Sequence, residues 1–139
     1  MKILEILTPK RKIGNIGEHF AKKHLRKNGY KIIKQNYVAA GNEIDIIAEN
    51  KDTIAFIEVK TRTVGRESPN ESRPAAAVTR QKQRKIISTA KYFLAGRGCE
   101  KHVSLDIIEV YLNSDKTKNR IVHIENAFNA NTAYEKYKR

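Results

Sequence analysis

Apolar residues recur at helical spacing in two stretches of the chain and at strand spacing in five others. The first helical stretch begins after Gly14-Asn15 and ends at Asn28-Gly29, and the second covers residues 79–94. Five segments have the composition of strands: residues 30–38, 43–49, 53–62, 103–112 and 121–124. The order of helix, three strands, helix and two strands predicts an α/β fold in which a mixed β-sheet is flanked by helices.

Short polar segments separate these elements. Ala40-Gly41 is typical of a tight turn, and residues 50–52 join two strands into a hairpin. Residues 64–74 contain one glycine and two prolines among polar residues and predict a loop.

The length of the chain suits one domain. A chain of 139 residues buries enough surface for a packed core. We therefore predict a single domain over residues 1–139, with a basic leader at 1–12 and a tail at 127–139 as flexible ends.

Two carboxylates and a lysine fall on facing strands of the hairpin. A loop centred on residues 51–52 pairs positions whose numbers sum to a constant, which places Asp45 opposite Glu58 and Glu43 opposite Lys60. Like charges about 5 Å apart on facing strands repel each other, so we expect a divalent cation between the two acids. Magnesium usually takes one or two carboxylates and keeps water and phosphate as its other ligands. Asp45 and Glu58 are therefore the expected metal ligands. Lys60 is the expected catalytic residue, which polarises water or stabilises charge on a phosphate.

Glu18 is a candidate third acid and a second expected catalytic residue. It lies three residues before Ala21 and seven before Leu25, at the edge of the buried stripe of the first helix. An ordinary acid near the positive end of the helix dipole would account for it equally well. Asp45 and Glu58 also have a plain alternative, as solvated positions of a half-exposed hairpin, because an E-x-K triplet alone is common. The strand around them is otherwise apolar, which favours a site.

The charge balance adds a partner. Lys and Arg number 28 against 15 Asp and Glu, which leaves a net charge of +13, and the basic residues gather in segments 22–34, 80–91 and 116–120. A basic folded surface of this kind favours a polyanion, although ribosomal proteins and proteins that bind anionic membranes share the signal. We expect contacts with nucleic acid from a set of basic residues near the hairpin: Arg62, Arg80, Lys82 and Arg84. A solvated helix face is the common alternative for the last three.

Other functional classes find little support. No stretch approaches the roughly twenty apolar residues that span a bilayer, so we expect a cytoplasmic protein. The single cysteine, Cys99, has no partner for an internal disulfide or a cysteine zinc site. The four histidines show no spacing typical of metal ligands.

Six stretches stand out as a set: G-N-I-G-E-H-F-A, N-G-Y-K-I-I-K-Q-N-Y, G-N-E-I-D-I-I-A, F-I-E-V-K-T-R, P-A-A-A-V-T and H-I-E-N-A-F. They are spread over residues 14–128 and resemble the YraN-like family of uncharacterised bacterial proteins, a similarity that covers nearly the whole chain. That family is placed in the restriction-endonuclease-like PD-(D/E)xK nuclease superfamily and is similar to archaeal Holliday-junction resolvases. The resemblance implies a metal-dependent nuclease centre. In that centre Asp45 and Glu58 bind the metal, Lys60 is the catalytic lysine, and Glu18 is the acid from the first helix.

The chain departs from the family pattern at two positions. Asn42 stands between Gly41 and Glu43, where the usual family string has glycine directly before Glu-Ile-Asp. The proline of the superfamily motif is also absent before Asp45.

Three functions remain open from the sequence. The first is a Mg²⁺- or Mn²⁺-dependent DNA endonuclease hydrolysing phosphodiester bonds, including those of branched DNA in repair or recombination. The alternative is a non-catalytic nucleic-acid-binding protein that keeps the fold, and a third is an adaptor for an acidic protein. The adaptor leaves the grouping of Asp45, Glu58 and Lys60 unexplained. A homodimer is the expected assembly if two strands are cut, because junction resolvases work as symmetric pairs.

Overall fold

The computed structural model describes residues 9–65, 78–97 and 100–129. Two helices and five strands follow one another along the chain: α1 (Pro9–Lys27), β1 (Lys31–Ala39), β2 (Asn42–Glu49), β3 (Thr53–Thr63), α2 (Arg80–Ala95), β4 (His102–Leu112) and β5 (Lys118–Ile124). The predicted fold class is confirmed. Most of the predicted loop at 64–74, Cys99 and the tail from residue 130 lie outside the described residues.

The first helix begins earlier than the sequence pattern indicates. It starts at Pro9, so residues 9–12 of the predicted basic leader are helical. Proline suits the first turn of a helix, where its missing N–H would have no intrahelical partner. Ile13 and Ile16 pack partly buried against the core beneath α1, so the apolar stripe of the helix extends into this segment. The start of the tail predicted to be flexible at 127–139 is also ordered, because Phe128 is buried in the core.

The strands form one mixed sheet in the order β1-β2-β3-β4-β5. Neighbouring strands are antiparallel except for β3 and β4, which run parallel. A parallel pair needs a long crossover connection, and the segment that contains α2 supplies it. At the β1 edge of the sheet, Ala40 and Gly41 form the predicted tight turn between β1 and β2, and both have positive φ.

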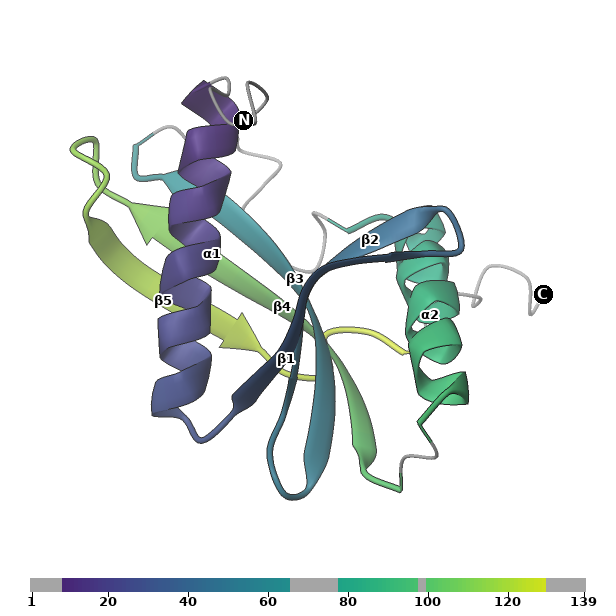
Figure 1. The fold of residues 1–139 in the computed structure, drawn as a ribbon. Coiled ribbons are helices and arrows are strands. Elements are labelled where there is room, and N and C mark those ends of the chain that lie inside the picture. Colours follow the sequence, from purple (N-terminus) through teal and green to yellow (C-terminus); the bar gives the residue numbers. More distant parts are fainter. Residues whose placement is uncertain (1–8, 66–77, 98–99, 130–139) are drawn as a thin grey trace, which may run out of the picture.

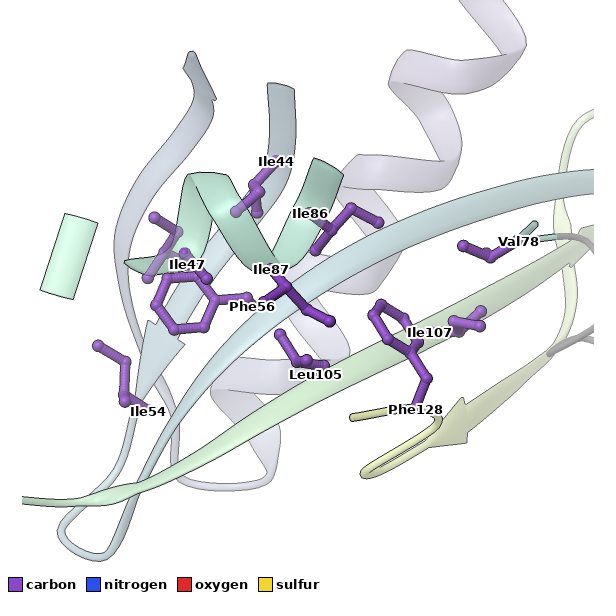
Figure 2. Close-up of a cluster of buried hydrophobic side chains, with 11 residues drawn as sticks. Ile44, Ile47, Ile54, Phe56, Val78, Ile86, Ile87, Leu105, Ile107 and Phe128 are labelled. Atoms are coloured by element: carbon purple, nitrogen blue, oxygen red, sulfur yellow. The ribbon is translucent and has the colours of Figure 1, made fainter. Parts of the chain in front are cut away.

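The two helices cover opposite faces of the sheet (Figure 1). Ile86 and Ile87 of α2 pack on Phe56 and Leu105 of the sheet, in a cluster that we call the α2-side core (Figure 2). Leu25 of α1 packs on the other face, in the α1-side core. That core also contains the following apolar residues: Ala21, Ile46, Ala48, Ala55, Ile57, Ile108, Val110 and Leu112. Strands β2, β3 and β4 therefore contribute residues to both cores, because successive side chains of a strand point to opposite faces of the sheet.

Helix α1 approaches the sheet very closely at Gly17. A Cβ atom placed on Gly17 would lie 1.8 Å from Oγ1 of Thr61 in β3, far inside van der Waals contact. Only glycine permits this approach, and the next residue in the helix is Glu18. The close contact therefore fixes the position of the candidate helix acid relative to β3.

Candidate functional site

The predicted register of the hairpin is confirmed. Ile46 pairs with Ile57 and Glu49 with Ile54, so paired positions have the constant sum that places Asp45 next in line with Glu58. The ladder between β2 and β3 ends at the pair Ile46 and Ile57, one step before the two acids.

The side-chain alternation of β2 breaks at Asp45. Ile44 packs in the α2-side core, whereas Ile46, two residues later, packs in the α1-side core. Residues two apart in a regular strand share a face, so the strand turns at Asp45 and leaves β3. Oδ2 of Asp45 then accepts a hydrogen bond of 2.8 Å from the backbone N–H of Val59. The carboxylate thus accepts from the N–H of Val59, which lies beyond the last backbone pair between β2 and β3.

The two acids are half-buried and repel each other. Burial, followed by the charge of Glu58, raises the pKa of Asp45 to about 7, and the charges of Glu18 and Glu43 act in the same direction. The hydrogen bond from Val59 lowers that pKa without offsetting the rest. Burial also raises the pKa of Glu58. A half-buried pair that resists holding two negative charges is a place where a cation would be stabilised.

Two lysines lie near Glu58. Nζ of Lys60 is 3.7 Å from Oε1 of Glu58, and the charges of Lys60 and Lys82 both lower the pKa of that acid. Lys60 reaches it from the same strand, two residues along, whereas Lys82 comes from the first turn of α2. The structure therefore brings Glu58, Lys60 and Lys82 together from two elements that are far apart in the sequence.

Lys82 is held in place from both ends. Its backbone N–H donates to Oγ1 of Thr79, the N-cap of α2, at 3.1 Å, and its Nζ donates to Oδ1 of Asn42 at 2.8 Å. Asn42 is the residue at which the chain departs from the family string, and here it ties the start of β2 to α2. The predicted neighbours Arg80 and Arg84 lie on the same first turns of α2, exposed and half-buried respectively.

Arg62 lies apart from this group. Its Nε is 2.6 Å from Oε2 of Glu109 on β4, and the two side chains are 9% and 0% exposed. The hydroxyl of Tyr111 donates to Oε1 of the same glutamate at 2.9 Å. A guanidinium held in a buried ion pair is poorly placed to meet a phosphate, so Arg62 has no part in the nucleic-acid surface described below.

The donor set suits a hard divalent cation in part. Asp45 and Glu58 supply carboxylate oxygens, and Mg²⁺ commonly uses one or two protein carboxylates, with water and phosphate as further ligands. Among the described residues no group of three or more His, Cys, Asp or Glu side chains is arranged to hold a metal ion. Any metal at this site therefore depends on water or substrate for the rest of its coordination.

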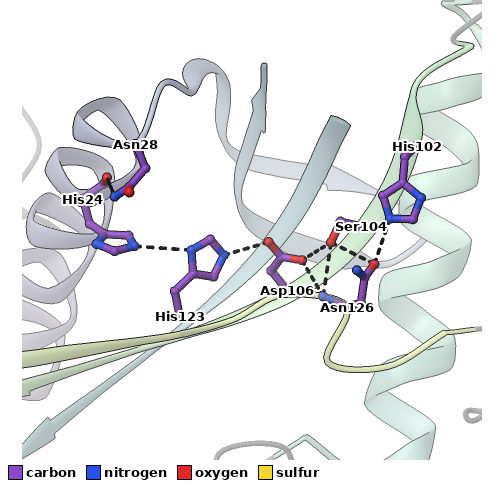
Figure 3. A network of polar contacts seen from close by, with 7 residues as sticks. All are labelled: His24, Asn28, His102, Ser104, Asp106, His123 and Asn126. Atoms are coloured by element: carbon purple, nitrogen blue, oxygen red, sulfur yellow. Dashed lines mark hydrogen bonds and ion pairs between the residues drawn. The ribbon is translucent and has the colours of Figure 1, made fainter. Parts of the chain in front are cut away.

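A second polar cluster was not predicted from the sequence. His24 of α1, His123 of β5 and Asp106 of β4 form a chain of hydrogen bonds on the α1 side of the sheet (Figure 3). Ser104 and the backbone N–H of Asn126 complete it around Asp106. The spacing of the histidines carried no signal, because the sheet brings them together from distant parts of the chain.

Comparison with solved structures gives weak likenesses. An XisH family protein from Nostoc punctiforme is 13% identical with a TM-score of 0.35, and the match covers 77% of this chain and 98% of the other. SfsA of Pyrococcus furiosus, solved in complex with Ca²⁺, is 16% identical with a TM-score of 0.35, over 84% of this chain and 63% of the other. Neither score is high enough to support an argument about the site. No helix among the described residues is long and apolar enough to cross a membrane.

Comparison with sequences gives strong matches. A relative from Caldanaerobacter subterraneus is 43% identical over 121 residues, which is 86% of this chain and 96% of the relative. A relative from Clostridium acetobutylicum is 40% identical over 119 residues, covering 85% and 94% of the two chains. Both carry the name of the family whose model matches residues 17–110, the family that the sequence motifs identified as YraN-like. The chain belongs to the uncharacterised protein family UPF0102.

Proposed function

We propose that the protein is a divalent-metal-dependent nuclease that hydrolyses phosphodiester bonds in DNA. The observation that carries the proposal is the position of Asp45 beside Glu58, where burial raises the pKa of both acids, the charge of Glu58 opposes ionisation of Asp45, and Lys60 lies alongside. A fold that needed only stability would gain by replacing one of these acids. Retaining both is explained if a cation binds between them during function.

Each residue has a distinct part in the proposed reaction. Asp45 and Glu58 would hold Mg²⁺ or Mn²⁺, and the hydrogen bond from Val59 to Asp45 fixes one carboxylate in advance. A bound cation of this kind supplies positive charge that favours an ionised water and stabilises negative charge on phosphate. Lys60 polarises the attacking water or stabilises charge that develops on the phosphate. Glu18, whose charge also acts on Asp45, is a further proton-handling residue from α1.

The nucleic-acid surface is proposed to lie over the N-terminal half of α2. Arg80, Lys82 and Arg84 would contact backbone phosphates, with Lys82 directed toward the acids by its bond to Asn42. Contacts of this kind give salt-sensitive binding without strong sequence preference. A homodimeric assembly belongs to the same proposal, because resolution of a four-way junction requires cuts in two strands. A cytoplasmic location is part of the proposal as well.

The direct test is cleavage of labelled linear, flapped and four-way DNA by the full chain, with Mn²⁺ and with a chelator. We expect metal-dependent cleavage that Asp45→Asn abolishes, and a product pattern that reveals the preferred DNA structure. Binding without cleavage under every metal condition would instead support the non-catalytic nucleic-acid-binding protein. The absence of both binding and cleavage would overturn the proposal.

The DNA surface has its own test. Replacing Arg80, Lys82 and Arg84 with alanine is expected to reduce the dependence of log K on log salt by about 2–3, since each lost phosphate contact contributes roughly 0.7–0.9. Lys51→Ala, an exposed site in the β2–β3 loop, is the control for a general change in charge. An unchanged slope in the triple variant would remove α2 from the DNA surface.

A further inference from the structure

A cavity of about 520 Å³ lies between α1 and β5, at the edge of the sheet opposite β1. Its lining combines two apolar and four basic side chains: Phe20, Lys23, His24, Lys27, Lys118 and Ile121. The four helical residues stand at positions i, i+3, i+4 and i+7 and so lie on one side of α1. Phe20 and Ile121 also pack against the α1-side core, which gives the cavity an apolar floor.

The rim of this cavity is strongly basic. Lys23 and Lys27 come from α1 and Lys118 from β5, and all three are exposed. Two of these lysines act on His24, because burial and then the charges of His123, Lys118 and Lys27 lower its pKa. Glu125 acts on His24 in the opposite direction. Convergence of three ammonium groups from two elements on one hollow favours an anion as its ligand.

The ring of His24 is held by a buried chain of hydrogen bonds (Figure 3). Nε2 of His24 lies 3.3 Å from Nδ1 of His123, and Nε2 of His123 lies 2.8 Å from Oδ2 of Asp106, whose side chain is fully buried. When His123 is neutral, its Nε2–H donates to the carboxylate of Asp106, and its Nδ1 accepts from Nε2–H of His24. The nitrogen of His24 that is left to take up a proton is Nδ1.

We propose that the cavity between α1 and β5 is a phosphate-binding site, in which Lys23, Lys27 and Lys118 supply charge and His24 takes up a proton as the anion binds. The site lies at the β5 edge of the sheet, whereas Asp45 and Glu58 lie where β2 and β3 separate, so it goes beyond the proposed nuclease centre. The phosphate group belongs either to a small molecule or to a nucleic acid, and both carry the same chemistry. The proton linkage follows because a nearby anion favours the charged form of His24.

Binding is tested on the full chain without metal, in an Asp45→Asn background, so that failure of the nuclease proposal leaves the result unaffected. Inorganic phosphate should shift the imidazole NMR signals of His24 and His123. Lys27→Ala/Lys118→Ala should weaken phosphate binding roughly tenfold or more, because two of three facing charges are lost. Lys51→Ala/Lys85→Ala changes net charge equally at exposed positions away from the cavity and should leave the affinity within about twofold.

Sulfate is the probe for the proton linkage, because it stays dianionic over the relevant range. Its affinity should rise as pH falls from 7.5 to 5.5, and His24→Gln should remove that rise while leaving some binding through the lysines. Oligonucleotides with a 5′-phosphate or a 5′-hydroxyl, compared with inorganic phosphate, distinguish a nucleic-acid end from a small molecule. Equal loss in the two double-lysine variants, or no shift of the His24 signals with any of these anions, would overturn the proposal.

Discussion

Two acid clusters lie in the same sheet, one buried around Asp106 and one half-buried around Asp45, and they are satisfied in opposite ways. Asp106 is surrounded by donors, since His123, the hydroxyl of Ser104 and the backbone N–H of Asn126 all direct hydrogen bonds at its two oxygens. Asp45 receives a hydrogen bond from Val59 and faces the charge of Glu58, and its pKa is raised to about 7.

The difference separates an acid that stabilises the fold from one that costs stability. A buried carboxylate with several donors has its acceptor oxygens satisfied and joins α1, β4 and β5 into one network. A half-buried carboxylate that faces a second one raises the free energy of the folded state until a cation or a proton arrives. On this physical ground the Asp45–Glu58 pair is the better functional candidate, although both clusters contain an aspartate.

The largest expected effect is on catalysis at the repelling pair. Lys60→Ala should lower the rate of DNA cleavage by about 10²–10⁴-fold, the usual contribution of a proton-transfer or charge-stabilising group. It should keep the thermal stabilisation by Mn²⁺, because the lysine is no ligand. Asp45→Asn should abolish cleavage and also erase most of that stabilisation, since a ligand stabilises only the state that binds it. If Asp45→Asn kept the full thermal stabilisation by Mn²⁺, the metal would not be held by the Asp45–Glu58 pair. Lys51→Ala is the control, which should keep both the cleavage rate and the stabilisation by Mn²⁺.

The next effect is on stability at the satisfied acid. Asp106→Ala should lower the free energy of unfolding by about 3–5 kcal/mol, because a buried hydrogen-bonded network loses its central acceptor. Urea denaturation measures the loss, and the shift of melting temperature with Mn²⁺ should remain. If Asp106→Ala lowered the free energy of unfolding by no more than an ordinary surface substitution does, Asp106 would not stabilise the network.

The placement of α1 relative to both clusters can be tested at Gly17. Gly17→Ala should destabilise the fold by about 1–3 kcal/mol, because its new Cβ would overlap Oγ1 of Thr61. Gly14→Ala is the matched control, with no atom within 4 Å of an added Cβ, and should stabilise the helix by up to about 1 kcal/mol. Adding Thr61→Ala should recover part of the loss in Gly17→Ala. Equal stability of the two single variants would contradict the close approach.

The smallest effect is the change in stability that Asp45→Asn brings to the metal-free protein, which is read from its pH dependence. The pKa of Asp45 is raised from 3.8 to about 7, so between these values the folded state holds a proton that the unfolded state has lost. The free energy of unfolding therefore falls as pH rises from about 4 to about 7. Asp45→Asn should flatten this fall and make the metal-free protein more stable at neutral pH by about 0.2–1 kcal/mol. Denaturation midpoints across that range measure both, and a fall of equal steepness in the variant would assign it to another group.

The sequence alone determined the features that depend on neighbours along the chain. The alternation of residues 43–49 and 53–62 and the short loop between them set the hairpin register, because side chains alternate with a period of two and a short loop leaves little choice of pairing. The order of elements likewise predicted a mixed sheet flanked by helices.

Only the tertiary structure decided which distant groups meet. Arg62 follows Lys60 along the strand, yet it pairs with Glu109, because β4 lies beside β3. The chain of His24, His123 and Asp106 joins residues up to 99 positions apart and has no periodic signal in the sequence. The turn of β2 at Asp45 arises where the strand divides its apolar residues between two cores. Such pairings depend on strand order and helix placement, which the packing of the whole sheet sets and no local pattern encodes.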